Sequence, residues 1–266
     1  MLDENAVHVW LAFETLLDDP ANAQRFSMLM SDEERARERR FLVEPARRLH
    51  VLARGLQREV LSSYLPGTTP RELRFMSTNG RPSLAPPFDA AGLVFNLAHT
   101  RGLAVLAVTR GAALGIDAEI YNEKVPLEVA RRFFSPVEAD ALEALPGDAQ
   151  PRRFLRLWTL KESYLKAEGS GLAGGLESMT FRIDDAGACT FERATDPRAA
   201  RWSFSQFDVG ERHVLALARL PERESRSRVK IEWREFGGAG GRAAAVNIRP
   251  LLHLTDESGQ EQRPES

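Results

Sequence analysis

Two acidic side chains on one predicted strand are the first residues in this sequence whose spacing suggests chemistry. Asp117 and Glu119 lie within Gly115–Ile120, where they alternate with aliphatic residues. Because successive side chains of a strand point to opposite faces, both carboxylates face the same way, about 7 Å apart at the backbone. Like charges on one face repel unless a cation lies between them. On the strand alone, the polar face of a half-exposed strand is the more common explanation, but a magnesium site also fits, since Mg²⁺ prefers oxygen ligands.

A predicted helix about 40 residues further along the chain carries a third carboxylate and two lysines. Trp158, Glu162 and Lys166 recur every four residues and so share one flank of this helix. Lys161 falls inside the broad apolar face, where it either reaches water or meets an anionic partner. Taken alone, these charges are equally well explained as a solvated helix surface. Together with the strand carboxylates, they predict a site for magnesium and a pyrophosphate.

Three further residues have both a structural and a functional explanation. Glu138 is the third helical residue after Ser135, the position at which a capping box places a glutamate for structural reasons alone. His99 and Thr100 lie in a polar turn between two predicted strands, and with Arg101 beside them they offer donors for a phosphate. A lone histidine is more often structural, so both explanations stay open.

Arginines form a third group. Arg81 lies in a turn after Gly80, and the run from Arg35 to Arg58, which includes Arg40 and Arg48, is rich in arginine. Most of these side chains are explained by solvation of helix faces, although they can also give a nearly neutral protein a basic face.

Hydrophobic periodicity predicts the elements that must position these residues. Alternating patterns predict strands at 7–13, 93–97, 103–109, 114–120, 179–183, 202–207 and 214–218. Helical spacing and capping signals predict helices that begin at 32, 45 and 136, and helices over 126–134 and 152–168. Helices followed by strands occur twice, which predicts an α+β protein made of two comparable lobes with a cleft between them.

These elements define the expected domains. Residues 1–112 are the expected N-terminal lobe and residues 113–222 the expected C-terminal lobe, and 223–266 is an extension expected to be flexible. Within the extension, Val229–Phe236 has the pattern of one extra strand, 237–241 is a glycine-rich linker, and 256–266 lacks core-forming residues.

Composition narrows the class of protein. The formal net charge of −2 argues against a general nucleic-acid binder, and the single cysteine, Cys189, excludes an internal disulfide framework. The sequence shows no signal peptide and no uninterrupted apolar run of about 20 residues, so a soluble cytoplasmic protein is expected. Motifs for P-loop ATPases, dinucleotide binding, serine hydrolases and zinc proteases are absent from the sequence.

Taken in order, the motifs resemble those of the 4′-phosphopantetheinyl transferases, in particular the two-lobed monomeric type that activates surfactin synthetase. The resemblance rests on Gly115-Ile-Asp-Ala-Glu119, Arg132-Phe-Phe-Ser-x-x-Glu138 and Trp158-x-x-Lys-Glu-Ser-x-x-Lys166, supported by Phe95-Asn-Leu-Ala-His-Thr100 and Gly80-Arg-Pro82. It covers roughly residues 7–219. It implies a magnesium-dependent holo-[acyl-carrier-protein] synthase type of enzyme, with coenzyme A bound between pseudo-symmetric lobes. Such an enzyme transfers 4′-phosphopantetheine from coenzyme A to a serine of an apo carrier protein, releasing adenosine 3′,5′-bisphosphate.

The resemblance also implies roles for individual residues. Asp117, Glu119 and Glu162 would bind Mg²⁺ or Mn²⁺, and Glu162 or Glu138 would take the proton from the serine. Lys166 would neutralise charge on the transferred phosphoryl group. The residues expected to contact coenzyme A are Arg40, Arg48, Arg81, His99, Thr100, Asp117, Trp158, Lys161 and Lys166.

The sequence departs from the family pattern at two of these motifs. Ala98 stands where the family usually has serine, and Arg81 replaces a lysine, which gives a forked cation in place of a point charge. Two other functions remain open at this stage. One is a magnesium-dependent hydrolase of a coenzyme A-like pyrophosphate, and the other is an inactive homologue that binds carrier proteins. The sequence does not indicate which carrier protein or pathway is served.

Overall fold

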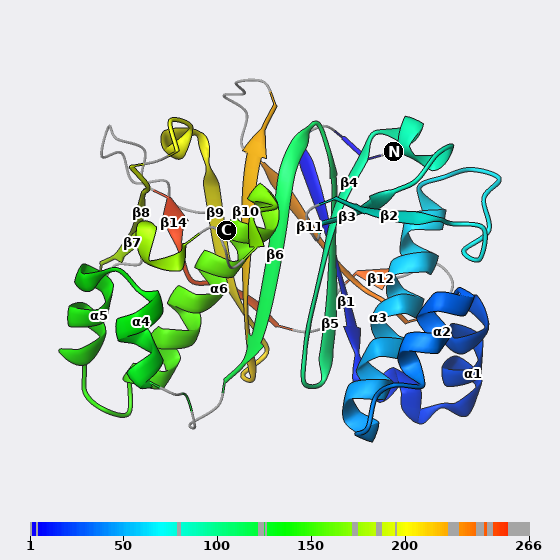
Figure 1. Ribbon diagram of the computed structural model, residues 1–266, viewed down its shortest axis with the longest axis horizontal. Helices are drawn as coiled ribbons and strands as arrows, with labels where there is room; N and C mark the ends of the chain where they lie inside the picture. Colours follow the sequence, from blue (N-terminus) through cyan, green and yellow to red (C-terminus); the bar gives the residue numbers. More distant parts are fainter. Residues whose placement is uncertain are drawn as a thin grey trace.

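The computed structural model describes residues 2–3, 5–78, 81–121, 125, 127–171, 175–184, 188–194, 196–222, 229–237, 242–243 and 247–254. Two β-sheets lie face to face in the middle of the molecule, and a group of helices covers the outer side of each (Figure 1). This arrangement confirms the predicted α+β class. Within the described residues, no helix combines the length and apolar content needed to cross a bilayer.

The first group of elements contains a long amphipathic helix and a meander of strands. In chain order they are β1 (Ala6–Phe13), the 3-10 helix η1 (Glu14–Asp18), α1 (Pro20–Leu29), α2 (Asp32–Glu38), α3 (Glu44–Ser63), β2 (Phe75–Thr78), β3 (Arg81–Leu84), η2 (Phe88–Ala91), β4 (Leu93–Thr100) and β5 (Leu103–Arg110). The predicted start of α2 is confirmed, because Ser31 and Glu34 form a capping box there. The strand pair β2–β3 and helix α1 were not predicted.

The second group repeats the theme of strands packed on one long helix. It consists of β6 (Ala112–Ile120), η3 (Leu127–Val129), α4 (Ala130–Phe133), α5 (Pro136–Glu143), α6 (Gln150–Glu168), η5 (Leu176–Ser178), β7 (Thr180–Ile183), β8 (Ala188–Glu192), η6 (Ala199–Arg201), β9 (Ser203–Val209) and β10 (His213–Pro221). The helix predicted over 126–134 is shorter in the structure, where a 3-10 turn precedes α4. Helix α6 ends at Gly169, which adopts the left-handed conformation (φ +79°) that favours glycine.

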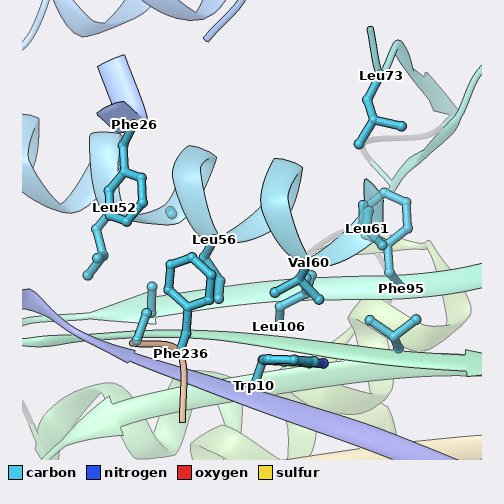
Figure 2. Packing of buried hydrophobic residues seen from close by; sticks show 14 of the residues in the cluster. Trp10, Phe26, Leu52, Leu56, Val60, Leu61, Leu73, Phe95, Leu106 and Phe236 are labelled. Carbon is cyan, nitrogen blue, oxygen red and sulfur yellow. The ribbon is translucent and has the colours of Figure 1, made fainter. Parts of the chain in front are cut away.

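Three hydrophobic clusters hold these layers together. The first lies between α3 and the outer side of the sheet β12-β11-β1-β5-β4, and Figure 2 shows Leu56 and Val60 of α3 above Trp10 of β1. The second lies between α6 and the sheet β13-β9-β10-β6. The third lies between the two sheets and contains Val9 of β1 and Ile116 of β6. The layer order is therefore helices, sheet, sheet, helices.

The last part of the chain returns to the first sheet. Strand β11 (Lys230–Glu235) pairs in parallel with β1, so the extra strand predicted over Val229–Phe236 is confirmed. Phe236 is buried in the first cluster beside Phe26 of α1. The remaining strands are β12 (Arg242–Ala243), β13 (Ile248–Pro250) and β14 (His253–Leu254). The predicted linker beyond Gly237 and the predicted tail over 256–266 lie outside the described residues, and the proposed domain boundaries stay predictions.

Candidate active site

The centre of the candidate site is an ion pair between β6 and α6. Lys166 Nζ donates to Asp117 Oδ1 at 2.6 Å and to the backbone oxygen of Ile116 at 3.3 Å. The pair forms because β6 lies directly against α6 at Gly115, where a Cβ atom would come within 2.0 Å of the Ser163 carbonyl oxygen. Asp117 is 6% exposed, so its negative charge is held in a partly desolvated place by one lysine.

Two more carboxylates lie in the same electrostatic environment. Burial and the neighbouring Asp117 and Glu162 charges raise the pKa of Glu119 to about 7, although Lys166 and a hydrogen bond from Thr100 act in the opposite direction. Burial, followed by the charge of Asp117, also raises the pKa of Glu162. The structure thus places the three carboxylates and the lysine that the sequence singled out within electrostatic reach of one another. Their mutual repulsion is the condition in which a cation between them is most favourable.

The donor atoms suit a hard divalent cation. Oδ2 of Asp117 is buried and has no hydrogen-bond partner among the described residues, so this carboxylate oxygen can serve as a ligand. Asp117, Glu119 and Glu162 supply the oxygen ligands that Mg²⁺ and Mn²⁺ prefer. In the described part of the chain, however, no three acidic, histidine or cysteine side chains converge as a metal centre does, and the ammonium of Lys166 is the cation that contacts Asp117.

Strand β4 borders this site from the other sheet. Strands β4 and β6 are edge strands of different sheets, and Asn96 Oδ1 joins them by accepting the backbone N–H of Ile116 at 2.9 Å. Further along β4, Thr100 reaches Glu119. Much of His99 remains accessible to solvent, yet desolvation by the surrounding protein and then the charges of Arg54 and Lys166 lower its pKa. Thr100 thus meets Glu119, and His99 lies within electrostatic reach of Lys166.

Arg81 reaches the same region from β3. Its Nη1 atom donates to the backbone oxygen of Ala167 at 3.1 Å, one residue beyond Lys166. Burial lowers the pKa of its guanidinium. The preceding residue of the predicted turn, Gly80, lies outside the described residues. Arg81 therefore places a cation from the first group of elements at the C-terminal end of α6.

Two predicted site residues are engaged elsewhere, and their assignments are corrected. Lys161 is fully buried, and its Nζ atom contacts the Leu176 and Met179 carbonyl oxygens (2.8 and 2.7 Å) and Glu138 Oε2 (2.7 Å). These three partners use all three donors of the ammonium group, so none remains for a phosphate.

The carboxylate of Glu138 is saturated in the same way. It accepts from the backbone N–H and hydroxyl of Ser135 (2.9 and 3.0 Å) and from the backbone N–H of Phe181 (2.8 Å). Together with Lys161, these contacts join α5, α6 and β7. Glu138 is buried and unavailable as a base, so the structural explanation given by its capping position is the correct one.

The remaining predicted ligands either have other contacts or are exposed. Arg48 is held by Asp18 (2.7 Å) and Glu14 (3.3 Å), whose carboxylates compete with any phosphate for its guanidinium. Arg40 is exposed in the turn after α2. Trp158 stacks on Phe154, with ring centroids 5.9 Å apart, and packs in the second hydrophobic cluster. Their roles toward coenzyme A stay predictions.

Sequence reasoning passed over two residues of this region. Arg54 was grouped with the solvated arginines, but its charge acts on His99 and burial lowers its own pKa. Its neighbours in sequence, Ala53 and Gly55, are small residues that are buried in α3, and this could have indicated that Arg54 is not fully solvated. Asn96 was noted only as part of a motif. A polar residue inside the apolar run of β4 signals a buried hydrogen bond.

Comparison with known proteins identifies the class to which this fold and site belong. The sequence profile of the 4′-phosphopantetheinyl transferase superfamily matches residues 113–218, the segment that holds β6 and α6. Over 215 residues, the chain is 39% identical to 4′-phosphopantetheinyl transferase HetI of Nostoc sp. The aligned region spans 80% of this chain and 86% of that protein. The protein therefore belongs to the 4′-phosphopantetheinyl transferase superfamily.

Two further similarities are more limited. The chain is 33% identical to 4′-phosphopantetheinyl transferase Sfp of Bacillus subtilis over 170 residues, 64% of this chain and 73% of that protein. Among solved structures, holo-[acyl-carrier-protein] synthase of Thermotoga maritima matches with a TM-score of 0.34 and 22% identity, over 43% of this chain and 66% of that chain. A TM-score of that size has no bearing on the arrangement of the site.

Proposed function

We propose that this protein transfers 4′-phosphopantetheine from coenzyme A to a serine hydroxyl of an apo acyl or peptidyl carrier protein. The products are the holo carrier protein and adenosine 3′,5′-bisphosphate. The observation that carries the proposal is the Lys166–Asp117 pair with Glu119 and Glu162 beside it, inside the segment that the family profile matches. Neither the hydrolase nor the inactive homologue receives support from the relatives, which are named as transferases.

Coenzyme A is an anion, and the cations around the site provide its binding region. Lys166 of α6 and Arg54 of α3 act on His99, and Arg81 of β3 reaches the C-terminal end of α6. Phosphate groups are best held by such charge-assisted donors. We assign the phosphates of coenzyme A to the junction between the two groups of elements.

A divalent cation, Mg²⁺ or Mn²⁺, would be held by Asp117, Glu119 and Glu162. The unpartnered Oδ2 atom of Asp117 and the raised pKa of the two glutamates support this assignment. When bound, the metal neutralises charge on the pyrophosphate oxygens of coenzyme A.

The protein groups position the reactants and move one proton. Glu162, whose pKa is raised, is a stronger base than an ordinary glutamate and takes the proton of the attacking serine hydroxyl. The serine oxygen forms a bond to the phosphorus atom of the pantetheine phosphate, and the bond from that atom to the bridging pyrophosphate oxygen breaks. Lys166 donates to a nonbridging oxygen as charge develops there. Glu138 has no part in this scheme, because its oxygens are saturated.

Both groups of elements lie on one chain, which supports action as a monomer. Coenzyme A and carrier proteins are found together in the cytoplasm, and we place the activity there. The exposed arginines near α2 would attract an acidic carrier protein before docking.

Intact-mass spectrometry of an apo carrier protein tests the proposal. Incubation with coenzyme A, Mg²⁺ and the wild-type protein should add one phosphopantetheinyl group, and a chelator should abolish the gain. Asp117→Asn should abolish it without loss of fold, while Glu211→Gln, in the exposed turn between β9 and β10, should not change it. Cleavage of coenzyme A without labelling would establish the hydrolase instead. Bound coenzyme A with no gain across fatty-acid, polyketide and peptide carriers would refute the transfer.

A further inference from the structure

A pocket lies on the face of the first sheet that is turned toward α3 and away from β6. Its volume is about 1300 Å³, and it opens between the C-terminal half of α3 and strands β1 and β11. None of the candidate active-site residues lines it. Strand pairing sets His8 beside Glu232 and Trp10 beside Arg234, so these side chains share the face that looks toward α3. Figure 2 shows Trp10 lying on the sheet below Val60, which also lines the pocket.

The floor of the pocket is a continuous chain of hydrogen bonds. Trp10 Nε1 donates to the Tyr64 oxygen at 2.9 Å, and Tyr64 lies 2.7 Å from His8 Nδ1. Because an ionised carboxylate can only accept, Nε2 of His8 carries the ring proton and faces Glu232 at 3.2 Å. Burial lowers the pKa of His8, and in the neutral ring Nδ1 accepts the Tyr64 hydroxyl. Every polar atom of this chain has a partner, so the aromatic floor is held in one arrangement.

One wall of the pocket carries more positive than negative charge. Glu232 is shared by Lys230 and Arg234, each at 2.9 Å. Hydrogen bonds from these two cations lower the pKa of Glu232 to about 2, so it remains ionised and neutralises only one of them. The guanidinium of Arg234 also lies 5.4 Å from the centre of the Trp10 ring. This wall offers a cation directly above an aromatic surface.

The opposite wall has a further cation. Arg25 is matched by Glu59 at 3.1 Å. Arg110, at the end of β5, lines the pocket and forms no ion pair within the described residues. Asp3, the third acidic residue of the lining, is at the exposed rim, where it accepts the backbone N–H of Asn5. Among its described residues, the lining therefore has one more cation than carboxylate, and the excess is at Arg110 and the Lys230–Arg234 pair.

We infer that this pocket binds a small organic monoanion with a flat apolar body, of the aryl carboxylate or aryl sulfonate class. The body would lie against Tyr64 and the small accessible part of Trp10, and the anionic group would meet Arg110 or Arg234. Ligand pockets typically combine an apolar lining with a few fixed polar groups in this way. The site is separate from the one at Asp117, and the inference does not depend on the proposed transfer activity.

A pair of matched dyes tests the inference on the full-length protein. The probe is 8-anilinonaphthalene-1-sulfonate, and its neutral counterpart N-phenyl-1-naphthylamine has the same rings without the sulfonate. Each is titrated in excess coenzyme A, with dye fluorescence and quenching of tryptophan emission as readouts. The sulfonate should bind at a single site about tenfold more tightly than the neutral dye, since one charge-assisted contact distinguishes them.

Variants place the dye in the pocket. Ser63→Trp puts a large side chain into the pocket from an exposed position on α3 and should abolish binding of both dyes. Arg110→Gln should weaken only the sulfonate, by about tenfold. Arg182→Gln is the matched control, because Arg182 is an exposed strand arginine far from this pocket and should have no effect. Unfolding curves verify that each variant is folded.

Two results would overturn the inference. Equal affinity for the two dyes would show that charge is not recognised. Unchanged binding to folded Ser63→Trp would show that the dye lies elsewhere.

Discussion

The closest approach between two elements of the active site suggests a sharp test of its geometry. At Gly115, a Cβ atom would lie 2.0 Å from the Ser163 carbonyl oxygen and 2.5 Å from the Ala167 backbone nitrogen. Both are backbone atoms of α6, so no side chain can rotate out of the way. An ordinary contact begins near 3.4 Å, and Gly115→Ala must therefore separate β6 from α6 by about 1.4 Å.

This displacement acts directly on the candidate catalytic residues. Asp117 moves with β6 and Lys166 moves with α6, and only 2.6 Å now separates their charged atoms. A misplacement of about 1 Å can reduce a rate about 100-fold, so we expect a loss of that order in the initial rate of carrier modification. Overpacking should also cost about 1–3 kcal/mol of the free energy of unfolding. For a chain of this size, Tm should fall by about 2–4 °C per kcal/mol.

The assay combines two measurements on each variant. Initial rates come from the mass gain of an apo carrier protein, measured at a temperature that is about 20 °C lower than the Tm of the variant. Stability comes from urea unfolding. Gly147→Ala is the control, because a Cβ atom at Gly147 has nothing within 4 Å. If Gly115→Ala retained activity within twofold of wild type, the spacing of β6 and α6 would not govern the site and our reasoning would be wrong.

Two further predictions concern the corrected and the buried charges. Lys161→Met should lower the free energy of unfolding by about 3–5 kcal/mol, because it leaves the buried Glu138 charge unpaired. The double variant Lys161→Met with Glu138→Gln should recover part of this loss. A Lys161→Met variant that is as stable as wild type but inactive would show instead that Lys161 binds a phosphate. Asp196→Asn tests pH dependence: burial raises the pKa of Asp196, but hydrogen bonds from Arg198, Trp202 and Tyr164 outweigh burial and hold it below its usual range. A depressed pKa stabilises the fold above the pKa of the unfolded chain, near 4, and this stabilisation is lost as the pH falls further. In urea unfolding the variant should therefore be less stable than wild type at pH 7, with a smaller difference at pH 3, and an equal difference at both values would contradict this account.

The active-site carboxylates could be predicted from the sequence because their positions follow from local periodicity. Alternation along β6 sets Asp117 and Glu119 on one face, and the spacing of Glu162 and Lys166 sets both on one flank of α6. Neither inference needed tertiary information. The contact between β6 and α6, by contrast, is tertiary information, and the sequence indicated it only through the order of the family motifs.

The role predicted for Lys161 was wrong because it depended on tertiary contacts. Lys161 was correctly predicted to lie inside the apolar arc of α6, and a buried anionic partner was one of the alternatives. Its actual partners are Glu138 and two carbonyl oxygens from the segment after the helix, and no local spacing predicts contacts between such segments. Family resemblance then favoured a phosphate. Burial of a lysine with three acceptors is a tertiary property, and only the structure shows it.

The return of β11 to β1 has a consequence for how the chain is synthesised. Val7 and Ile231 are paired neighbours, yet more than 200 residues separate them in the sequence. On the ribosome, one edge of β1 must wait unpaired until the segment that contains β11 has been translated, because its partner strand does not yet exist. Closing so long a loop is also slow. The first sheet therefore stays open at β1 until β11 has been made, and an exposed strand edge of this kind is where a chaperone would be most needed.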